Sequence, residues 1–219
     1  MNLKKQSALY TLLLLTALYA QKTMANETPQ KHPFYLGAGV GYGSTTWDGI
    51  VPPEKNKNLA MSLSTPNTVQ EGGVVGGIFA GYEFSRYFAL ETNYFRFPTA
   101  HVFFDKISLF SFMNEGMTEL ITHTETVNLM AKIILTIPQT SIRAFSSAGA
   151  AGIHRFDILY DHWRLSPTFG VGLNHNVTPH VMAEIAANYT AGYGESQLNP
   201  SDVYFPFLYS VLIRLAYRV

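Results

Sequence analysis

Hydrophobic and polar residues alternate along most of the chain after residue 33. The alternation is clearest over 205–219, where every odd position is apolar and both Arg214 and Arg218 fall on even positions. A period of two residues places these two sets of side chains on opposite faces of a β-strand. The same period predicts eight strands that together account for the chain after its leader: 34–43, 73–84, 87–97, 123–136, 141–154, 163–175, 180–192 and 205–219.

The two faces of the predicted strands differ in chemistry. One face carries no charged residue and is rich in aliphatic and aromatic side chains. The opposite face carries glycines, small polar residues and eight charges, three acidic and five basic: Glu83, Glu91, Lys132, Arg143, Arg164, Glu184, Arg214 and Arg218. Such a sheet closes either into a soluble barrel with an apolar interior or into a membrane barrel with its apolar face outside.

The composition of the mixed face favours the membrane barrel. A water-exposed surface carries about 25–35% charged residues, and this face is poorer in charge than that. Small residues and nearly balanced charges instead fit the filled lumen of a narrow barrel. We therefore predict an all-β fold, an eight-stranded antiparallel up-and-down transmembrane β-barrel over residues 34–219. Aromatic residues near the strand ends are predicted to form the girdles at the membrane interfaces: Tyr42, Tyr82, Phe84, Phe88, Tyr94, Tyr189, Phe207 and Tyr217.

Residues 1–25 have the features of a secretory signal peptide. Two lysines near the start precede an apolar stretch over 8–20, and a small-x-small pattern ends at Ala25. The apolar stretch is shorter than the roughly 20 residues that a spanning helix needs. Residues 26–33 are polar and contain prolines, so we expect a flexible leader before the barrel.

The links between the predicted strands alternate in length. Three are tight turns and two are long: 85–86, 137–140 and 176–179 against 44–72 and 98–119. Bacterial barrels have short periplasmic turns and longer external loops, so both long links are predicted to be extracellular. They are the expected site of contact with a host or surface partner. The apolar segment 102–113 either extends a hairpin above the membrane, which we favour, or forms a contact surface.

These features resemble the OmpA-like family of eight-stranded outer membrane β-barrels. The similarity is strongest in GYEFSRYFALETNYFRF at 81–97 and SPTFGVGLNHNVTPHVMAEIAANY at 166–189. The final LIRLAYRV at 212–219 is similar to the assembly signal of such barrels, although Val219 stands where the family commonly ends in Phe. The resemblance implies a monomer in a Gram-negative outer membrane, inserted by the barrel insertion machinery and surrounded by outer-membrane lipid and lipopolysaccharide.

Five of the inward charges are candidates for a network inside the lumen: Glu91, Lys132, Arg143, Glu184 and Arg214. An isolated buried charge is costly, so these groups are expected to form salt bridges with one another. The resemblance implies that such a network plugs or gates the lumen. We favour structural filling over a regulated pore, because an eight-stranded barrel has room for little more than side chains.

The sequence offers little catalytic or cofactor chemistry. Cys is absent, and 15 basic residues balance 15 acidic residues, so neither thiolate chemistry nor nucleic-acid binding is predicted. None of the seven histidines has metal-ligand spacing. His154 and His162 flank two aspartates, and we interpret this segment as a solvated loop rather than a weak cation site. Ser146 and His175 share the apolar face without forming a convincing catalytic pair, so no catalytic, metal or cofactor-binding residue is predicted.

The sequence therefore predicts a non-enzymatic outer membrane protein, a structural scaffold that displays long extracellular loops for surface contacts. Two alternatives stay in the same membrane: a small gated channel and a lipid-modifying enzyme. A third alternative is a soluble periplasmic barrel that binds a small ligand.

Overall fold

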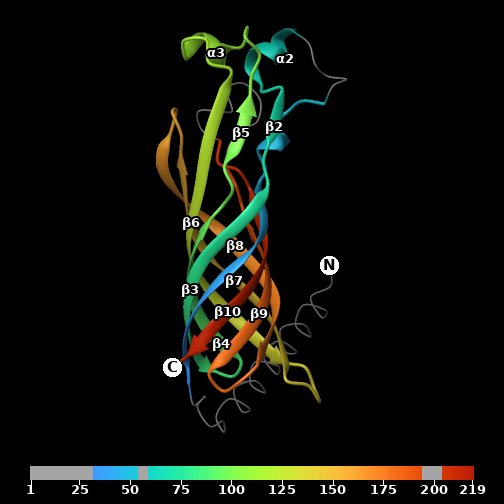
Figure 1. Ribbon diagram of the computed structural model, residues 1–219, viewed down its shortest axis with the longest axis vertical. Coiled ribbons are helices and arrows are strands. Elements are labelled where there is room, and N and C mark those ends of the chain that lie inside the picture. The colour runs from blue at the N-terminus through green and yellow to red at the C-terminus, as the bar shows by residue number, and fades with distance from the viewer. Residues whose placement is uncertain (1–31, 54–58, 194–203) are drawn as a thin grey trace, which may run out of the picture.

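The computed structural model describes residues 32–53, 59–193 and 204–219 (Figure 1). The predicted signal peptide and most of the predicted leader lie outside the described residues. The elements, in chain order, are β1 (Phe34–Thr45), η1 (Trp47–Ile50), α2 (Leu59–Ser64), β2 (Thr68–Gln70), β3 (Gly73–Ser85), β4 (Phe88–Arg96), β5 (Ala100–Phe103), α3 (Leu109–Met113), β6 (Glu119–Thr136), β7 (Ile142–Phe156), β8 (Asp161–Asn176), β9 (Val181–Thr190) and β10 (Leu208–Arg218). Among these residues no helix is long and apolar enough to cross a bilayer.

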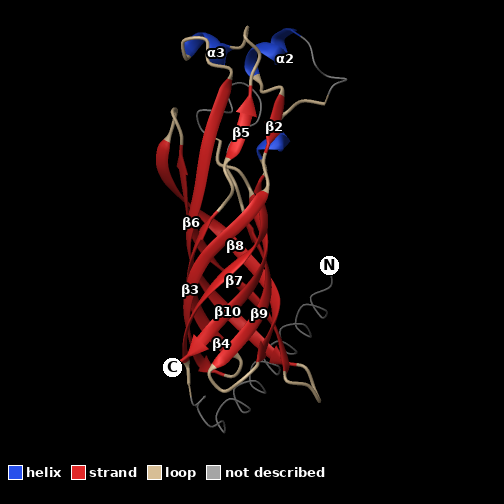
Figure 2. Ribbon diagram, in the orientation of Figure 1, coloured by secondary structure: helices blue, strands red, loops and turns tan. Residues whose placement is uncertain are grey.

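Eight long strands close into an antiparallel barrel (Figure 2). Their order in the sheet is β6-β4-β3-β1-β10-β9-β8-β7, and the pairing of β6 with β7 completes the cylinder. Each long strand therefore lies beside the long strand that precedes it in the chain, and β1 pairs with β10. The predicted fold is confirmed, and every observed long strand overlaps its predicted range.

The two faces of the barrel wall divide as the alternation predicts. Outward aliphatic side chains such as Val40, Leu129 and Ile213 are more than half exposed. Inward residues of the same strands, such as Asn128 and Arg214, are buried. A surface of this kind is stable against lipid and unfavourable against water, because it exposes a continuous apolar band.

Arg164 corrects the predicted set of eight lumen charges. Its position on β8 has the inward parity, yet the residue is exposed, and its guanidinium carbon lies 5.5 Å from the centre of the Phe205 ring. β9 pairs with β8 only from Thr168 onward, so β8 rises beyond its neighbour at Arg164. The alternation of residues shows which way a side chain points. It does not show where one strand extends beyond its neighbour in the sheet.

The two ends of the barrel are built differently. Three tight turns and the C-terminal Val219 lie at one end, which we call the turn end (Figure 1). The long links gather at the other, which we call the loop end, where β5 pairs with β2 on one side and with the start of β6 on the other. The resulting small sheet and the helices η1, α2 and α3 form a cap above the barrel.

The favoured hairpin extension over 102–113 is confirmed only at its first two residues. Val102 and Phe103 belong to β5, whereas α3 occupies Leu109–Met113. Ser108 caps this helix, because its side chain accepts a hydrogen bond from the Ser111 N–H. The cap buries its own apolar cluster, which we call the cap core: Trp47, Ile50, Ala100, Val102, Phe104, Phe110, Leu120 and Tyr204.

Candidate functional site in the barrel lumen

Four buried charges form one layer across the middle of the lumen, which we call the central ion layer. Lys132 Nζ lies 2.8 Å from Glu91 Oε2 and 2.9 Å from Glu184 Oε2. Arg214 Nη2 lies 2.6 Å from Glu91 Oε1, and its Nη1 bonds the other carboxylate, that of Glu184. Each acid therefore contacts both bases. The layer is a closed ring of four ion pairs with no net charge.

The other four long strands contribute aromatic side chains, or the space for them, around the central ion layer. The Tyr35 hydroxyl on β1 donates to Glu91 Oε2 over 3.0 Å. The Phe79 ring on β3 lies 3.6 Å from the Arg214 guanidinium carbon, and the Phe145 ring on β7 lies 4.0 Å from Lys132 Nζ. On β8, a Cβ at Gly172 would stand 2.5 Å from the Phe145 ring, so glycine is what admits that ring. All eight long strands thus contribute to filling the lumen at this level.

Arg143 does not join the central ion layer, contrary to the predicted single network. Both of its Nη atoms lie 3.1 Å from the two carboxylate oxygens of Glu83, and its Nε donates to Asn174 over 2.7 Å. Arg218 bonds the same carboxylate. These three charges form a second cluster near the turn end, which we call the turn-end ion cluster. The structure thus brings four of the five predicted residues together, whereas Arg143 forms its ion pair with Glu83.

A third buried ionic cluster, which the sequence did not predict, lies at the loop end. Arg155 Nε lies 2.6 Å from Asp157 Oδ2, and both side chains are fully buried. The Arg155 guanidinium lies between the rings of Trp47 and Tyr160, at 4.7 and 5.3 Å from the ring centres. Its Nη1 also donates to the Tyr204 carbonyl over 2.6 Å. We call these five residues, which come from three different links or strand ends, the lid.

The lid corrects the interpretation of the third link as a solvated loop at Asp157, whereas Asp161 and His162 of the same segment are exposed. Asp157 is buried and also accepts hydrogen bonds from the backbone N–H groups of Leu159 and Tyr160. The signal was available in the sequence, because extending the predicted period of 141–154 by one residue places Arg155 on the same inward face as Arg143. The predicted strand ended one residue too early to include it.

Glu71 fixes η1 beneath the lid. Its carboxylate accepts hydrogen bonds from the Trp47 N–H at 2.8 Å, the Asp48 N–H at 3.3 Å and the Thr45 hydroxyl at 3.1 Å. Burial raises the pKa of this carboxyl, although the backbone hydrogen bonds act in the opposite direction. Trp47 is thereby held in the cap core from its backbone as well as from its ring.

The structure does not bring Ser146 and His175 together. No group of three or more His, Cys, Asp or Glu side chains among the described residues is arranged to hold a metal ion. His175 pairs across the sheet with Ile142, whereas Ser146 pairs with Val171, and His175 Nδ1 contacts the Ser141 carbonyl. Ser146 and His175 are therefore not hydrogen-bonded to each other.

A closed sheet, an outward apolar band and a lumen filled with paired charges define a β-barrel that spans a membrane. The family described as "Outer membrane protein beta-barrel domain" matches residues 10–210, and the chain belongs to this family. It is accordingly an integral protein of the Gram-negative outer membrane. The resemblance to OmpA-like barrels, inferred from the sequence, is confirmed.

Individual relatives are distant. An uncharacterized protein of Coxiella burnetii is 23% identical in an alignment 218 positions long, which includes 84% of this chain and 84% of that protein. The crystal structure of OprG from Pseudomonas aeruginosa matches with a TM-score of 0.52 at 11% identity, over 88% of this chain and 99% of that one. Neisserial surface protein A matches with a TM-score of 0.50 at 14% identity, over 85% and 97%. At such identities the two structures show a shared fold and nothing finer.

Proposed function

We propose that this protein is a non-enzymatic, monomeric scaffold whose plugged barrel carries a folded cap on the cell surface. This proposal is supported by the general arrangement of bacterial barrels, in which short turns face the periplasm and long loops, such as those that form the cap, face outward. The barrel wall contacts outer-membrane lipid and lipopolysaccharide, and β10 is the segment that the barrel insertion machinery recognises.

The observation that carries the proposal is the apolar display on α3. Phe112 is 86% exposed and Met113 is 70% exposed, although the cap buries Phe110 from the same helix. Phe110 stacks on Phe104 with ring centres 4.2 Å apart, so the helix is held from behind while its outer face stays open. Exposed apolar groups on an otherwise folded surface mark sites of contact with partners.

The contact function is tested by changing α3 in the full chain. Gram-negative cells that display the protein are assayed for adherence to epithelial monolayers, with cells lacking the protein as the baseline. The double variant Phe112→Ser/Met113→Ser is expected to fall to that baseline, because it removes the exposed apolar groups without touching the cap core. It is expected to fold normally, since surface substitutions change the free energy of unfolding by less than about 0.5 kcal/mol.

Ile158→Ser is the matched control. Ile158 is 58% exposed in the turn between β7 and β8, outside α3. This variant should adhere like the unmodified protein. Equal adherence of the α3 variant and the unmodified protein would contradict the contact role while leaving the scaffold role intact.

The second candidate is a small gated channel, favoured by the ring of ion pairs that would have to open for ions to pass. Planar-bilayer conductance decides between the two. The scaffold predicts no steady openings at neutral pH, because every charge of the central ion layer has two partners across the lumen. Steady openings would make the channel the correct function.

A further inference from the structure

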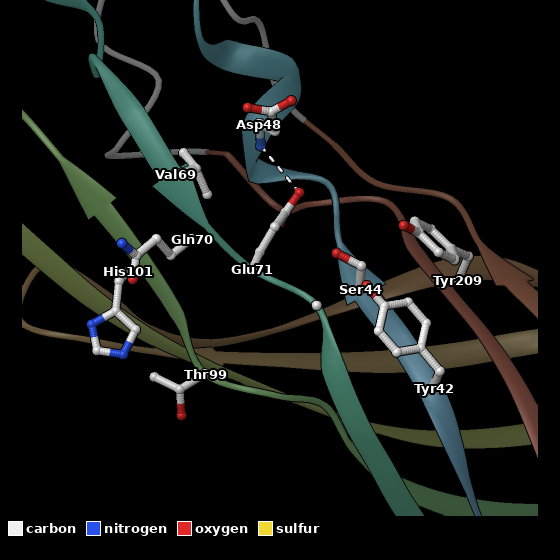
Figure 3. Close-up of a pocket in the computed structure, with 10 residues that line it drawn as sticks. Tyr42, Ser44, Asp48, Val69, Gln70, Glu71, Thr99, His101 and Tyr209 are labelled. Atoms are coloured by element: carbon white, nitrogen blue, oxygen red, sulfur yellow. Dashed lines mark hydrogen bonds between the residues drawn. The ribbon is translucent and has the colours of Figure 1, made fainter.

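A polar cleft lies on the outer side of the loop end, between the barrel wall and the cap (Figure 3). Its volume is about 710 Å³, and small-ligand sites commonly measure about 300–1,000 Å³. The cleft is separate from the lumen clusters and from α3. Ten residues line it: Tyr42, Ser44, Asp48, Val69, Gln70, Glu71, Gly72, Thr99, His101 and Tyr209.

Two tyrosines form one side of the cleft. Figure 3 shows Tyr42 and Tyr209 on neighbouring strands, with Gln70 and His101 on the other side. The tyrosines are 57% and 43% exposed, so their rings remain available to a ligand. Gly72 has a φ of 85°, and a Cβ there would stand 2.4 Å from the Tyr42 hydroxyl oxygen. Glycine is therefore needed both for this backbone conformation and for the position of the ring.

The cleft begins where the apolar band ends. Tyr42 pairs with Val74 on β3 and with Val211 on β10, and both valines are more than half exposed on the lipid-facing surface. Outward tyrosines just above such a band lie at the level of the lipid head groups. A ligand arriving from the membrane would therefore present its head group to the cleft and leave its acyl chains against the valines.

The charges around the cleft select against an anionic ligand. The ten described residues that line it include two carboxylates, Asp48 and Glu71, and neither Lys nor Arg. The imidazole of His101 is engaged, because its Nδ1 lies 2.7 Å from the Glu119 carboxylate. A phosphate or sulfate would meet like charge without a compensating cation, which is unfavourable in a partly desolvated site.

We propose that this cleft binds an uncharged saccharide. A sugar ring has an apolar C–H face, which suits the exposed tyrosine rings, and hydroxyl groups, which suit the exposed Gln70 amide and Asp48 carboxylate. The saccharide comes either from a glycolipid of the surrounding leaflet or from free glycan outside the cell. This site goes beyond the scaffold role and shares no residue with the α3 surface.

The experiment uses the full chain in phosphatidylcholine nanodiscs and saturation-transfer NMR. The probes are a neutral tetrasaccharide, lacto-N-neotetraose, and a heparin-derived tetrasaccharide. The neutral probe should bind, and the sulfated probe should bind at least about tenfold more weakly because the lining is acidic. Tyr42→Ala should weaken binding of the neutral probe about tenfold, as expected for loss of an aromatic anchor.

Tyr217→Ala is the matched control, because Tyr217 is also 57% exposed on the outer face but lies on β10 near the turn end. It should leave binding unchanged. A second arm adds a glycolipid carrying the same tetrasaccharide to the nanodiscs. Saturation transfer from the protein to the lipid-linked sugar, reduced by Tyr42→Ala, supports the proposal with the membrane as source. Transfer to the soluble sugar alone supports it with free glycan as source.

Three results would overturn the assignment: no transfer in either arm, binding of the sulfated probe at least as tight as that of the neutral one, or equal losses from Tyr42→Ala and Tyr217→Ala. The first two results would exclude an uncharged saccharide as the ligand. The third would exclude this cleft as the place where it binds. None of them bears on adherence through α3, so the two proposals fail independently.

Discussion

The lumen of the barrel and the core of the cap differ in how much charge they bury. In the lumen, charged side chains pair with one another, as Glu91 does with Lys132, and pack against buried aromatic rings such as Phe79. The exposed apolar side chains of the barrel face outward. In the cap, the side chains that meet are apolar, as at Phe104 and Phe110. The difference follows from the solvent outside each region, lipid around the barrel and water around the cap.

β6 passes through both regions without changing its parity. Its even positions face inward throughout, yet they carry Leu120 in the cap and Asn128 and Lys132 in the barrel. Its outward positions carry Glu125 near the loop end and Leu129 lower down. One strand thus shows that alternation determines which way a side chain points, whereas the surrounding solvent determines which chemistry suits that direction.

The largest effect is expected from a substitution that leaves a net charge inside the lumen. Lys132→Met leaves Glu91 and Glu184 to share Arg214, so the variant buries one uncompensated negative charge. We expect the free energy of unfolding to fall by about 3–5 kcal/mol, as for other broken buried ion pairs. Urea unfolding of the barrel in phospholipid vesicles, followed by tryptophan fluorescence, measures this change.

Two further variants separate charge balance from packing. Lys132→Met/Glu184→Gln restores neutrality around Arg214 and should recover most of the lost stability. Lys106→Met changes an exposed lysine of the cap and should have almost no effect. If Lys132→Met itself unfolds within about 1 kcal/mol of the unmodified protein, the ring of ion pairs is not what stabilises the lumen.

Two substitutions on the outward face of β6 test where the surroundings of the strand change from lipid to water. Leu129 and Ile121 both face outward, at 55% and 44% exposure, but only Leu129 lies in the apolar band. Leu129→Arg is expected to cost about 2–3 kcal/mol, because it places a cation in lipid. Ile121→Arg should cost less than about 0.5 kcal/mol in the same urea assay, because its surroundings are aqueous. Equal costs would mean that the lipid boundary has been placed wrongly.

The lid lies between the two regions and gives the smallest expected effect. Arg155→Met leaves the Tyr204 carbonyl and the Asp157 carboxylate without their cation. The free energy of unfolding should fall by about 1–3 kcal/mol, less than for Lys132→Met, because Asp157 keeps two hydrogen bonds from backbone N–H groups. Because the contacts are confined to the loop end, hydrogen exchange should rise in η1 and around Tyr204 while the barrel strands stay protected. Arg164→Met, which changes an exposed arginine, provides the comparison. Faster exchange throughout the barrel would show that the lid is part of the global structure.

The fold was predictable because a two-residue period fixes the direction of every side chain on a strand. The grouping of the lumen charges was not predictable. It depends on the stagger between neighbouring strands, which determines the level along the barrel axis at which each charged side chain lies. Hence Arg143 was expected beside Glu91 but lies beside Glu83. The cap escaped prediction for another reason: β2 spans only Thr68–Gln70, too short a segment for a period to be recognised.

The pairing of β1 with β10 has a consequence for how the protein is assembled. The first and last long strands close the cylinder, so a sheet that lacks β10 carries two open edges. Glu91 and Arg214 lie 123 positions apart in the sequence, and their contact across the lumen also requires β10. Pairing of β10 therefore both closes the cylinder and completes the neutral central ion layer, through contacts of long sequence separation that are expected to form slowly.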